Sequence, residues 1–546
     1  DPATGTIKCR SQFDAASAVG YNAASYPGGP AALAADIAAC VPYNPFGAGN
    51  NAAAVAYFKQ NIINRASISQ FDATAFLNGD TSGFFNFQGG PVGFVVGAEY
   101  RAEKVFNNSD DAADSGVSNS VFLGDVNPPA LRVKEAFAEL RLPILRDTWI
   151  ARELSFSGAA RVSDYNTSLG TVFTYNVGAE YVPVEGIRFR ANYGRAIRAP
   201  NVTEYGFPNV PNFANGFIDP CNANAIGANA IRNSNCTSQL TGAQLANLPL
   251  AGYSLGIISG SNPNLKEETS TSYTYGVVLT PSFMPGFSVT ADYYNISVKN
   301  VITTLSAQTI VNSCYDSPGL SSPLCNAFKR NLDTTNGPKG ELPGQILFNS
   351  LVAGPQNFAR RVRRGLDIEA AYRHDFGNEF KMSTRLIYSH QFTNSNYENP
   401  TFPNLENRIL EELGDPQDEF TWKVDLTKGP VTLGYTMHYI GPMYTSTFEN
   451  FNALSSACTT SGSTTVCPPL NLDAIEPQKY PTVIYHSLRL EFDAKSTGVA
   501  KDMRFYIGVD NLANKLPPYG TTATGSGSAI YSFRGRSFFA GAVAKF

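Results

Sequence analysis

The sequence predicts an all-β protein whose strands form a transmembrane antiparallel barrel. Two observations indicate this class. Short segments of alternating apolar and polar residues recur along the chain, and the connections between them are short and long in turn. The segments are rich in Val, Ile, Tyr, Phe and Thr, which favour strands. No apolar run approaches the roughly 18 to 20 residues that a membrane-spanning helix needs.

The earliest clear strand is RASISQFDATAF, which begins at Arg65. Later segments follow the same rule. In GIRFRANYGR, Phe189 and Tyr193 lie on one face of the strand, while Arg188 and Arg190 lie on the other. The segments RRGLDIEAAY, IYHSLRLEFD and MRFYIGVD repeat the pattern. About fifteen strands are predicted in this way.

The connections decide between a barrel and a soluble sandwich, because a sandwich with one wet face would show the same alternation. The short connections are VPVEG, PSFMPGF, HDFGNE, TKGPV and AKSTGVAKD. The long ones cover residues 200–264, 301–361, 394–418 and 441–481. Brief inner turns and long external loops are typical of outer-membrane barrels. A sandwich has no reason to sort its connections in this way.

The two ends of the chain carry further expectations. If the last strand runs from outside to inside, residues 1–64 form an external loop region and residues 65–546 form the barrel. About fifteen is an odd number, whereas a single-chain bacterial barrel has an even number of strands. The chain starts at Asp1 without a secretory leader. We therefore expect it to be the C-terminal portion of a larger barrel.

The last segment, RGRSFFAGAVAKF, keeps its alternation as far as Phe546. Because free termini fray unless they are tied down, we expect this strand to pair within the sheet. A terminal Phe on the outer face resembles the assembly signal that the barrel insertion machinery of the outer membrane reads. The alternative is a chain that is simply cut at this point.

The eight cysteines fall into four local pairs, and each pair lies within one long connection. The pairs are Cys9 with Cys40, Cys221 with Cys236, Cys314 with Cys325, and Cys458 with Cys467. Sequence alone leaves other pairings open. A metal site would need tight Cys/His spacing, and the four histidines lie outside these connections. We therefore expect disulfides, which persist at the cell surface, and neither a metal nor a cofactor.

Three stretches resemble the TonB-dependent outer-membrane receptor family: NYGRAIRAPNVTEYG, GSNPNLKEETSTSYTYGV, and the closing pair VDNLANKLPPY with FRGRSFFAGAVAKF. The resemblance runs from about Gly90 to Phe546. Glu267 and Ala513 depart from the usual pattern, which puts the subfamily in doubt. The resemblance implies a barrel of 22 strands whose lumen is closed by a plug. The plug, the energy-coupling box and the early strands are not recognised in this sequence.

The resemblance also implies a function and a set of partners. The function is active uptake of a scarce or bulky nutrient across the outer membrane of a Gram-negative bacterium: siderophore-bound iron, haem, cobalamin or an oligosaccharide. The partners are outer-membrane lipid and lipopolysaccharide, the TonB complex acting through an N-terminal region, and the assembly machinery. The alternative is a passive pore or a surface-binding barrel without energy coupling. A balanced charge, with 41 basic and 45 acidic residues, argues against nucleic-acid binding.

Two groups of residues are candidate ligand contacts. The first group is basic. The segment FARRVRRG places four arginines near the outer end of one strand: Arg360, Arg361, Arg363 and Arg364. Arg195 and Arg198 lie near the end of another strand. They predict an anion-attracting rim, with lipopolysaccharide binding or lumen pairing with Asp367 and Glu369 as the alternatives.

The second group is aromatic, and its rings are candidates to stack on a ligand. It comprises Tyr253, Tyr315, Phe328, Tyr444, Phe448 and Phe451. The alternative is an aromatic girdle at the membrane interface. The Gly-rich stretch NGDTSGFFNFQGG lacks the ending of a phosphate-binding loop and is interpreted as a turn. No set of catalytic residues is recognised, so no enzymatic activity is expected.

Overall fold

The computed structural model describes residues 4–14, 29–46, 51–59, 61–111, 125–400, 403–445, 459–461, 464–466, 479–495, 502–518 and 530–545. Contacts divide the chain into two units. The first comprises Asp1–Ser69 with Lys104–Pro129, and the second comprises Gln70–Glu103 with Ala130–Phe546. Each unit is described by itself below.

The first unit contains three short helical elements: η1 (Arg10–Gln12), α1 (Gly29–Ala39) and α2 (Ala52–Phe58). A disulfide between Cys9 and Cys40 joins the segment before η1 to the residue after α1. The Gln12 side chain donates to the carbonyl oxygens of Ile37 and Cys40, both at 3.0 Å. The disulfide and these hydrogen bonds hold a segment in which few side chains are buried.

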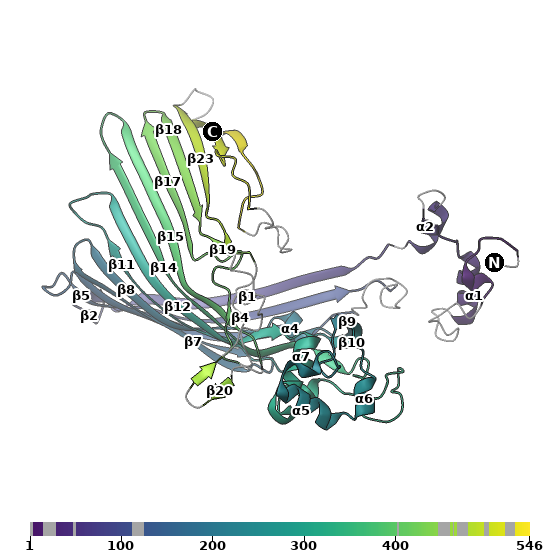
Figure 1. Ribbon diagram of the computed structural model, residues 1–546. Helices are drawn as coiled ribbons and strands as arrows, with labels where there is room; N and C mark the ends of the chain where they lie inside the picture. The colour runs from purple at the N-terminus through teal and green to yellow at the C-terminus, as the bar shows by residue number, and fades with distance from the viewer. Residues whose placement is uncertain are drawn as a thin grey trace. The chain divides into compact units, whose positions relative to one another are not determined.

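The second unit is built on one large sheet, in which the main strands follow one another in chain order (Figure 1). They are β1 (Arg65–Asp80), β4 (Gly93–Asn108), β5 (Leu131–Arg146), β6 (Glu153–Tyr165), β7 (Thr171–Val184), β8 (Ile187–Arg198), β11 (Glu268–Leu279), β12 (Phe287–Thr304), β14 (Pro355–Asp375), β15 (Phe380–Tyr397), β17 (Asp418–Lys428), β18 (Val431–Ile440), β23 (Val483–Lys495), β24 (Asp502–Asp510) and β25 (Ser537–Lys545). The predicted count of about fifteen strands is confirmed. Neighbouring strands from β4 to β25 pair antiparallel.

The predicted sorting of connections is also confirmed, with one exception. Short connections occur at one end of the sheet, for example residues 185–186, 376–379 and 429–430, and long ones at the other. The exception is the β6–β7 connection, residues 166–170, which is short although it lies at the long-loop end. NGDTSGFFNFQGG forms the short hairpin of β2 (Asn86–Phe87) and β3 (Gly90–Pro91) between β1 and β4.

Three strands extend further into the long connections than the sequence predicts. β12 continues to Thr304 and β14 begins at Pro355, so the ends of the predicted loop 301–361 belong to strands. Likewise β15 continues to Tyr397. The pairing of β12 with β14 shifts register between Val298 and Val301, where Asn300 has φ 55°. A bulge of this kind interrupts the two-residue alternation on which the prediction depended.

The connections β8–β11 and β12–β14 fold together into one compact body, called here the loop domain (residues 208–259 and 305–354). Its sheet has β10 (Tyr253–Ser259) in the centre, antiparallel to β9 (Val210–Phe217) and parallel to β13 (Leu351–Ala353). Its helices are η3 (Ile226–Ala228), α5 (Ala230–Gln239), α6 (Gly242–Ala246), α7 (Ala307–Tyr315), η4 (Pro318–Leu320) and η5 (Pro323–Ala327). In Figure 1 they gather at the end of the sheet that carries the long connections.

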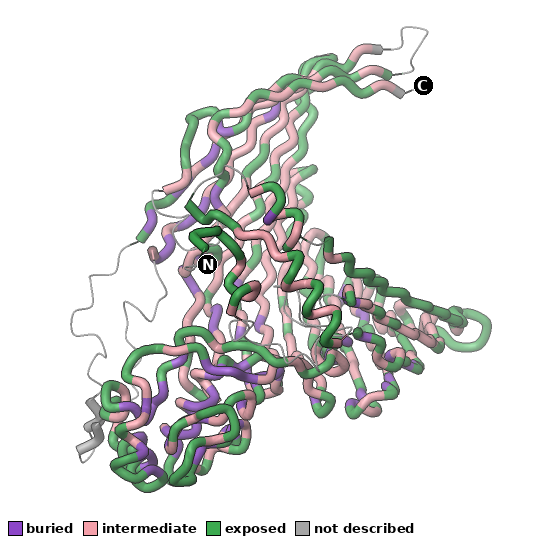
Figure 2. Tube along the Cα trace, turned by 90° about the vertical axis from the view of Figure 1, so that its right-hand side faces the viewer, coloured by how far each residue is buried: buried purple, intermediate pink, exposed green. Residues whose placement is uncertain are grey.

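The loop domain has a hydrophobic core of its own. Buried positions gather there, whereas most residues of the large sheet are intermediate or exposed (Figure 2). The core includes Phe217 of β9, Leu255 of β10, Ile310 and Tyr315 of α7, and Leu351 of β13. These residues come from both connections, so burying them requires the two connections to fold as one body.

Three of the four predicted disulfides are present: Cys9–Cys40, Cys221–Cys236 and Cys314–Cys325. The latter two both lie in the loop domain. Cys221–Cys236 joins the segment before α5 to that helix, and Cys314–Cys325 joins α7 to η5. The fourth predicted pair, Cys458 and Cys467, and the terminal Phe546 lie outside the described residues.

The remaining elements are short. They are α4 (Val202–Gly206), β16 (Asn407–Arg408), β19 (Met443–Tyr444), β20 (Thr459–Ser461), β21 (Thr464–Val466) and β22 (Lys479–Tyr480). β16 pairs with the outer end of β15, while β19 pairs with β22 and β20 with β21.

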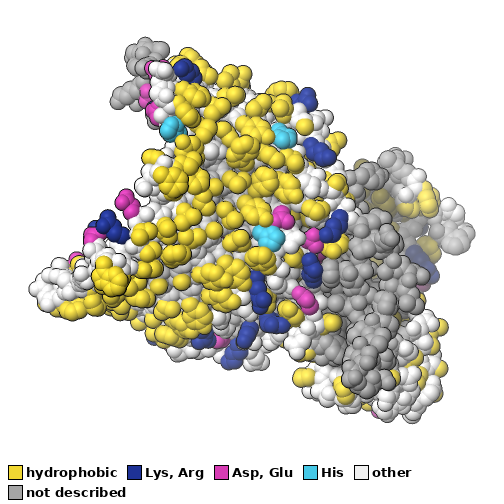
Figure 3. All heavy atoms as spheres, turned by 60° about the vertical axis from the view of Figure 1, so that its left-hand side comes forward, with side chains coloured by type: hydrophobic (Ala, Val, Ile, Leu, Met, Phe, Trp, Pro, Cys, Tyr) yellow, Lys and Arg dark blue, Asp and Glu magenta, His cyan; other side chains and the backbone are white. Residues whose placement is uncertain are grey.

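The two faces of the large sheet differ in chemistry, as the alternation predicts. On one face, Phe189 of β8, Tyr275 of β11, Tyr293 of β12 and Leu366 of β14 line a shallow apolar hollow. Figure 3 shows apolar side chains spread across the strands of this face. We call it the apolar face, and the opposite one the polar face.

The polar face is crossed by ion pairs between strands. Arg190 Nε donates to Asp292 at 2.8 Å, Arg385 Nε lies 2.8 Å from Glu369, and Arg504 Nε lies 2.7 Å from Asp493. These charged residues therefore find partners on neighbouring strands of the polar face.

Candidate functional site

The strand register divides the six predicted arginines between the two faces. Arg364 of β14 lies between Val362 and Leu366 in the alternation, so it shares the apolar face with Leu366. By the same rule Arg360 and, on β8, Arg195 lie on the apolar face. Arg198, Arg361 and Arg363 lie on the polar face.

The three polar-face arginines lie at the outer end of the sheet and meet acidic partners there; we call this group the mouth cluster. Arg198 bonds to Glu204 at 2.9 Å and to Glu268 at 2.6 Å. Arg361 Nη2 lies 3.5 Å from Glu398 Oε1.

Glu204 is placed by α4, where it completes a capping box with Asn201. The segment APNVTEYG therefore has a structural role: it caps a short helix and fixes the carboxylate that holds Arg198. The sequence singled out this segment only as part of a family resemblance.

Arg363 differs from the other two mouth arginines because its hydrogen-bond partners are neutral. Its guanidinium donates to the carbonyl oxygens of Val362 at 3.1 Å and Ser395 at 3.2 Å, and to Asn396 Oδ1 at 3.4 Å. Asp415 is close enough to interact with it electrostatically and is itself bonded to Asn394 at 2.7 Å. Half-buried and bonded to weak acceptors, Arg363 is the mouth residue best placed to gain from an anionic ligand.

The mouth cluster corrects two details of the sequence prediction. Its three guanidinium groups lie near the carboxylates of Glu204, Glu268, Glu398 and Asp415, so among the described residues this cluster itself has no basic excess. The alternative pairing with Asp367 and Glu369 is not observed. Asp367 accepts a hydrogen bond from Ser389 at 2.6 Å, and Glu369 is bonded to Arg385. The acidic partners come from other loops and strands, which alternation within β14 does not indicate.

The tyrosines that were candidates to stack on a ligand lie mostly in cores. Tyr315 is fully buried (0% exposed), and its hydroxyl accepts a hydrogen bond from Arg330 Nε at 2.7 Å. Tyr253 packs edge-on against Phe217, with ring centroids 5.5 Å apart. Tyr444 is 8% exposed, and Lys479 Nζ lies 4.6 Å from its ring centroid. Phe328 is buried with Tyr315.

The rings of Tyr315, Tyr444 and Phe328 thus support the loops and do not face solvent, because the loops form cores that the sequence did not predict. Tyr253 is only partly buried but has the same packing role. Phe448 and Phe451 lie outside the described residues.

A buried ion pair holds the two halves of the loop domain together. Arg330 Nη1 lies 2.7 Å from Asp219 Oδ2, and the two side chains are 1% and 0% exposed. Arg330 also donates to the Gly344 carbonyl oxygen at 2.7 Å, and its guanidinium lies 5.0 Å from the Tyr315 ring centroid. Burial opposes the charge of Arg330, but Asp219 and the Tyr315 hydroxyl outweigh burial and raise the pKa of Arg330 above its usual value.

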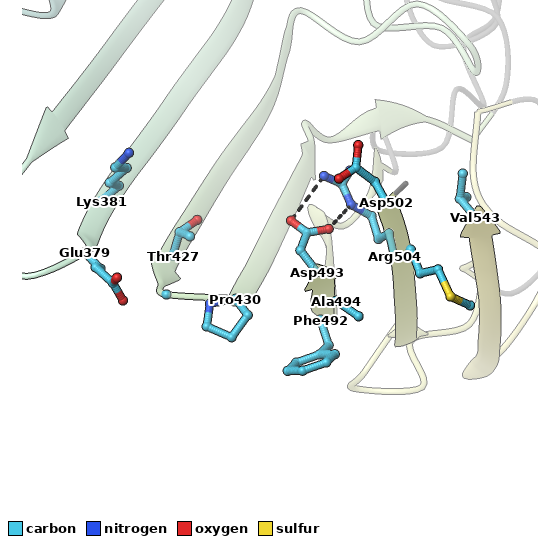
Figure 4. A pocket seen from close by; sticks show the side chains of 12 residues that line it. Glu379, Lys381, Thr427, Pro430, Phe492, Asp493, Ala494, Asp502, Arg504 and Val543 are labelled. Atoms are coloured by element: carbon cyan, nitrogen blue, oxygen red, sulfur yellow. Dashed lines mark hydrogen bonds and ion pairs between the residues drawn. The ribbon is translucent and has the colours of Figure 1, made fainter. Parts of the chain in front are cut away.

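A separate hollow of about 980 Å³ lies at the end of the sheet that carries the short connections. In Figure 4, Glu379, Lys381, Thr427 and Pro430 come from one side of it, and the bonded pair Arg504–Asp493 comes from the other. It lies at the opposite end of the strands from the mouth cluster. Of its charged residues, Arg504 is paired with Asp493, and Lys381 lies 3.7 Å from Asp375.

The whole-chain comparison identifies the family. The sequence matches the family described as TonB dependent receptor-like, beta-barrel, over residues 15–512. The chain belongs to this family. Its large antiparallel sheet, with an apolar face and long loops at one end, is therefore a transmembrane receptor barrel sheet, as predicted. Among the described residues, no helix has the length and apolar character needed to cross a membrane.

Solved receptor structures share the fold of this barrel. The siderophore receptor PirA from Acinetobacter baumannii aligns with a TM-score of 0.52 at 12% identity, over 88% of this chain and 55% of that one. A variant of the ferric enterobactin receptor PfeA from Pseudomonas aeruginosa aligns with a TM-score of 0.54 at 14% identity, over 88% and 54%. The chain thus spans about half the length of these receptors. No curated protein matches the sequence.

Proposed function

We propose that this chain is the barrel portion of an outer-membrane receptor that imports a scarce or bulky nutrient actively in a Gram-negative bacterium. The family match over residues 15–512 carries the proposal. Siderophore-bound iron is the ligand class to test first, because the solved structures with this fold are named siderophore and ferric enterobactin receptors. Haem, cobalamin and oligosaccharides are the comparison ligands. Binding and transport, and not catalysis, are the proposed activities.

The proposed route begins at the long-loop end of the barrel. The loop domain and the mouth cluster meet the ligand outside the cell, and the polar face lines the passage inward. Energy comes from the TonB complex, acting through a plug and coupling segment N-terminal to this chain. Lipopolysaccharide and membrane lipid surround the apolar face. The assembly machinery reads the C-terminal segment of the chain, which includes the last strand β25 and the terminal residue Phe546.

Energy coupling is tested by uptake in the native bacterium carrying the full-length receptor. Cells are given ⁵⁵Fe bound to an added siderophore, with and without the inner-membrane energising complex. We expect uptake that depends on both the receptor and the complex. Uptake that needs the receptor but continues unchanged without the complex would instead support the passive pore. Haem, cobalamin and labelled oligosaccharides are assayed in parallel.

The mouth cluster is tested with one substitution and a matched control. Arg363→Gln removes the guanidinium that has neutral partners at the outer end of β14. Arg373→Gln removes the same charge from the same face, near the inner end of the same strand. For an anionic ligand we expect Arg363→Gln to weaken binding by about tenfold or more, as for the loss of a charge-assisted hydrogen bond. Arg373→Gln should leave binding within about twofold of the original. Equal effects of the two substitutions on binding would contradict the proposal that Arg363 contacts the ligand.

A further inference from the structure

Two hollows lie on the polar face of the large sheet, over strands β4 to β8. One has a volume of about 490 Å³ and reaches the outer end of the sheet, where Ala196 lines it. The other has a volume of about 780 Å³ and reaches the inner end, where Asp80 lines it. Both are lined by Glu139, Ala159 and Asn176, so the two hollows adjoin. Together they form one groove, called here the wall groove.

The wall groove extends along the polar face from one end of the strands to the other. Its outer end adjoins the mouth cluster, because Ala196 lies on the same face as Arg198 and two residues from it. Its inner end lies at Asp80, where the connection from β1 to β4 begins. The hollow of about 980 Å³, by contrast, is lined by residues of the inner end. Of these hollows, the wall groove is therefore the one that joins the mouth to the inner end.

Small side chains form the floor of the wall groove over β6 and β7. Ser157 of β6 pairs with Gly178 of β7, and Ala159 pairs with Asn176, all on the polar face. A side chain at position 178 would fill this space, since its Cβ atom would lie 2.6 Å from Ser157 Oγ. The floor is therefore low because glycine, alanine and serine occupy it.

Longer side chains border the floor on both sides. Glu139 and Arg141 lie on the polar face of β5, and Arg188 lies on that of β8. Arg188 bonds to Glu180 of β7 at 2.5 Å, so this carboxylate is engaged at the border of the groove. β5 and β8 are three strand spacings apart, which is about 14 Å. The groove is thus a depression two strands wide between two rows of longer side chains.

In the outer half of the groove, the one arginine of the floor is held toward a border. The guanidinium of Arg161 donates to Glu99 at 3.0 Å and to Glu135 at 2.9 Å. It also lies 4.8 Å from the ring centroid of Phe137. All three partners belong to β4 or β5, so they hold the guanidinium on the side away from β7. The hollow beside it is lined by Thr174 of β7.

The polar groups of the floor are mainly hydroxyls and amides. The side-chain amides of Asn176 and Asn192 donate to each other, at 2.8 and 2.9 Å. Each amide keeps one N–H and one oxygen lone pair for a further hydrogen bond. Neutral groups of this kind exchange hydrogen bonds with a ligand without holding it by charge. They suit a ligand that must move on after each contact.

We propose that the wall groove is a water-filled passage, along which a hydrophilic ligand rich in hydroxyl or amide groups moves inward beside the plug. The inference rests on the proposed uptake function and assigns the route to strands β4–β8. The plug contacts the longer side chains that border the groove, and the low floor between them stays open to water. Elsewhere on the polar face, long side chains pair across neighbouring strands, as Arg385 and Glu369 do.

The openness of the groove is tested by cysteine labelling of the purified full-length receptor with a sulfonated maleimide. All cysteines of the described residues are in disulfides, so they do not compete for the reagent. Ser157→Cys places a thiol in the floor, and Ser487→Cys is the matched control on the polar face of β23. Labelling after unfolding corrects for intrinsic reactivity.

We expect the thiol at position 157 to react at least about tenfold faster than the thiol at 487, because a thiol under the plug reacts only when that contact opens. Equal rates, or a slower rate at 157, would overturn the proposal. This comparison needs no imported ligand, so it decides about the groove even if the proposed uptake function fails.

The passage itself is tested by uptake in the native bacterium carrying the Ser157→Cys receptor. The thiol bears either the bulky maleimide or, as the matched control, a methylthio group. Cells are given ⁵⁵Fe bound to an added siderophore, haem, cobalamin and labelled oligosaccharides. For each ligand that the unlabelled receptor imports, we expect the maleimide to lower uptake at least about tenfold and to leave surface binding within about twofold. Uptake that is equal with the two labels would overturn the proposal.

Discussion

At the scale of single residues, the direction a side chain faces matters more than its type. Arg363 and Arg364 are adjacent in the chain, yet one faces the mouth cluster and the other faces the lipid side. Sequence alternation was sufficient to separate them in principle. Their partners could not be predicted, because Glu398 and Asp415 reach the mouth from the β15–β17 connection. A residue pattern within one strand contains no information about that connection.

The buried pair Arg330–Asp219 is the residue-scale feature with the largest expected effect on stability. Asp219→Ala leaves a buried guanidinium without its counterion, which costs about 3–5 kcal/mol. Asp333→Ala is the control, because Asp333 is exposed in the same connection as Arg330. We expect protease cleavage and amide exchange in the loop domain to rise only with Asp219→Ala. If both variants stay as protected as the original, the pair does not hold the domain together.

The loop domain is also expected to weaken at alkaline pH. Burial raises the pKa of Tyr315 and of Tyr253 above its usual value. The neutral rings therefore contribute stability that is fully present below about pH 10, the pKa of an unfolded tyrosine. That stability is lost as the pH rises through the higher folded values. Tyr253→Phe, which cannot ionise, should keep the loop domain protease-resistant to higher pH than the original. An identical pH dependence would contradict this.

At the scale of elements, the structure separates strands that could be predicted from a domain that could not. The strands could be predicted because each one satisfies a two-residue period within its own segment. The loop domain depends on contacts between distant segments: Asp219 and Arg330 are 111 residues apart in the chain. β10 lies between a strand from its own connection and a strand from the next one. No local period marks such a sheet.

The disulfides of the loop domain are expected to stabilise its elements locally. Replacing Cys314 and Cys325 with Ser removes the bond between α7 and η5, at a cost of about 2–4 kcal/mol. The matched control replaces Cys9 and Cys40, whose disulfide belongs to the other unit. Amide exchange should increase in α7 and η5 for the first pair only. Unchanged exchange there would show that the core alone holds these helices.

At the scale of the whole molecule, two properties could be predicted from the sequence: the sheet with its sorted connections, and the contrast between its faces. The predicted number of strands and their order agree with the structure because alternation and loop length are both local properties. The structure also shows that long connections can form ordered, packed structure. Two of them fold into a domain with its own core at the mouth of the barrel.

The central claim is that alternate residues of the sheet face lipid and water, and spin labels on one strand test it most directly. Single cysteines are placed at positions 272, 273, 274, 275 and 277 on β11 of the full-length receptor in membrane vesicles and labelled with a nitroxide. Gly276 is left unchanged, because a Cβ there would meet Asp292 and the Ala291 carbonyl oxygen. We predict a two-residue period: oxygen dissolved in lipid reaches positions 273, 275 and 277, and a water-soluble nickel complex reaches 272 and 274 more readily. Equal access of the nickel complex to all five positions would contradict the account.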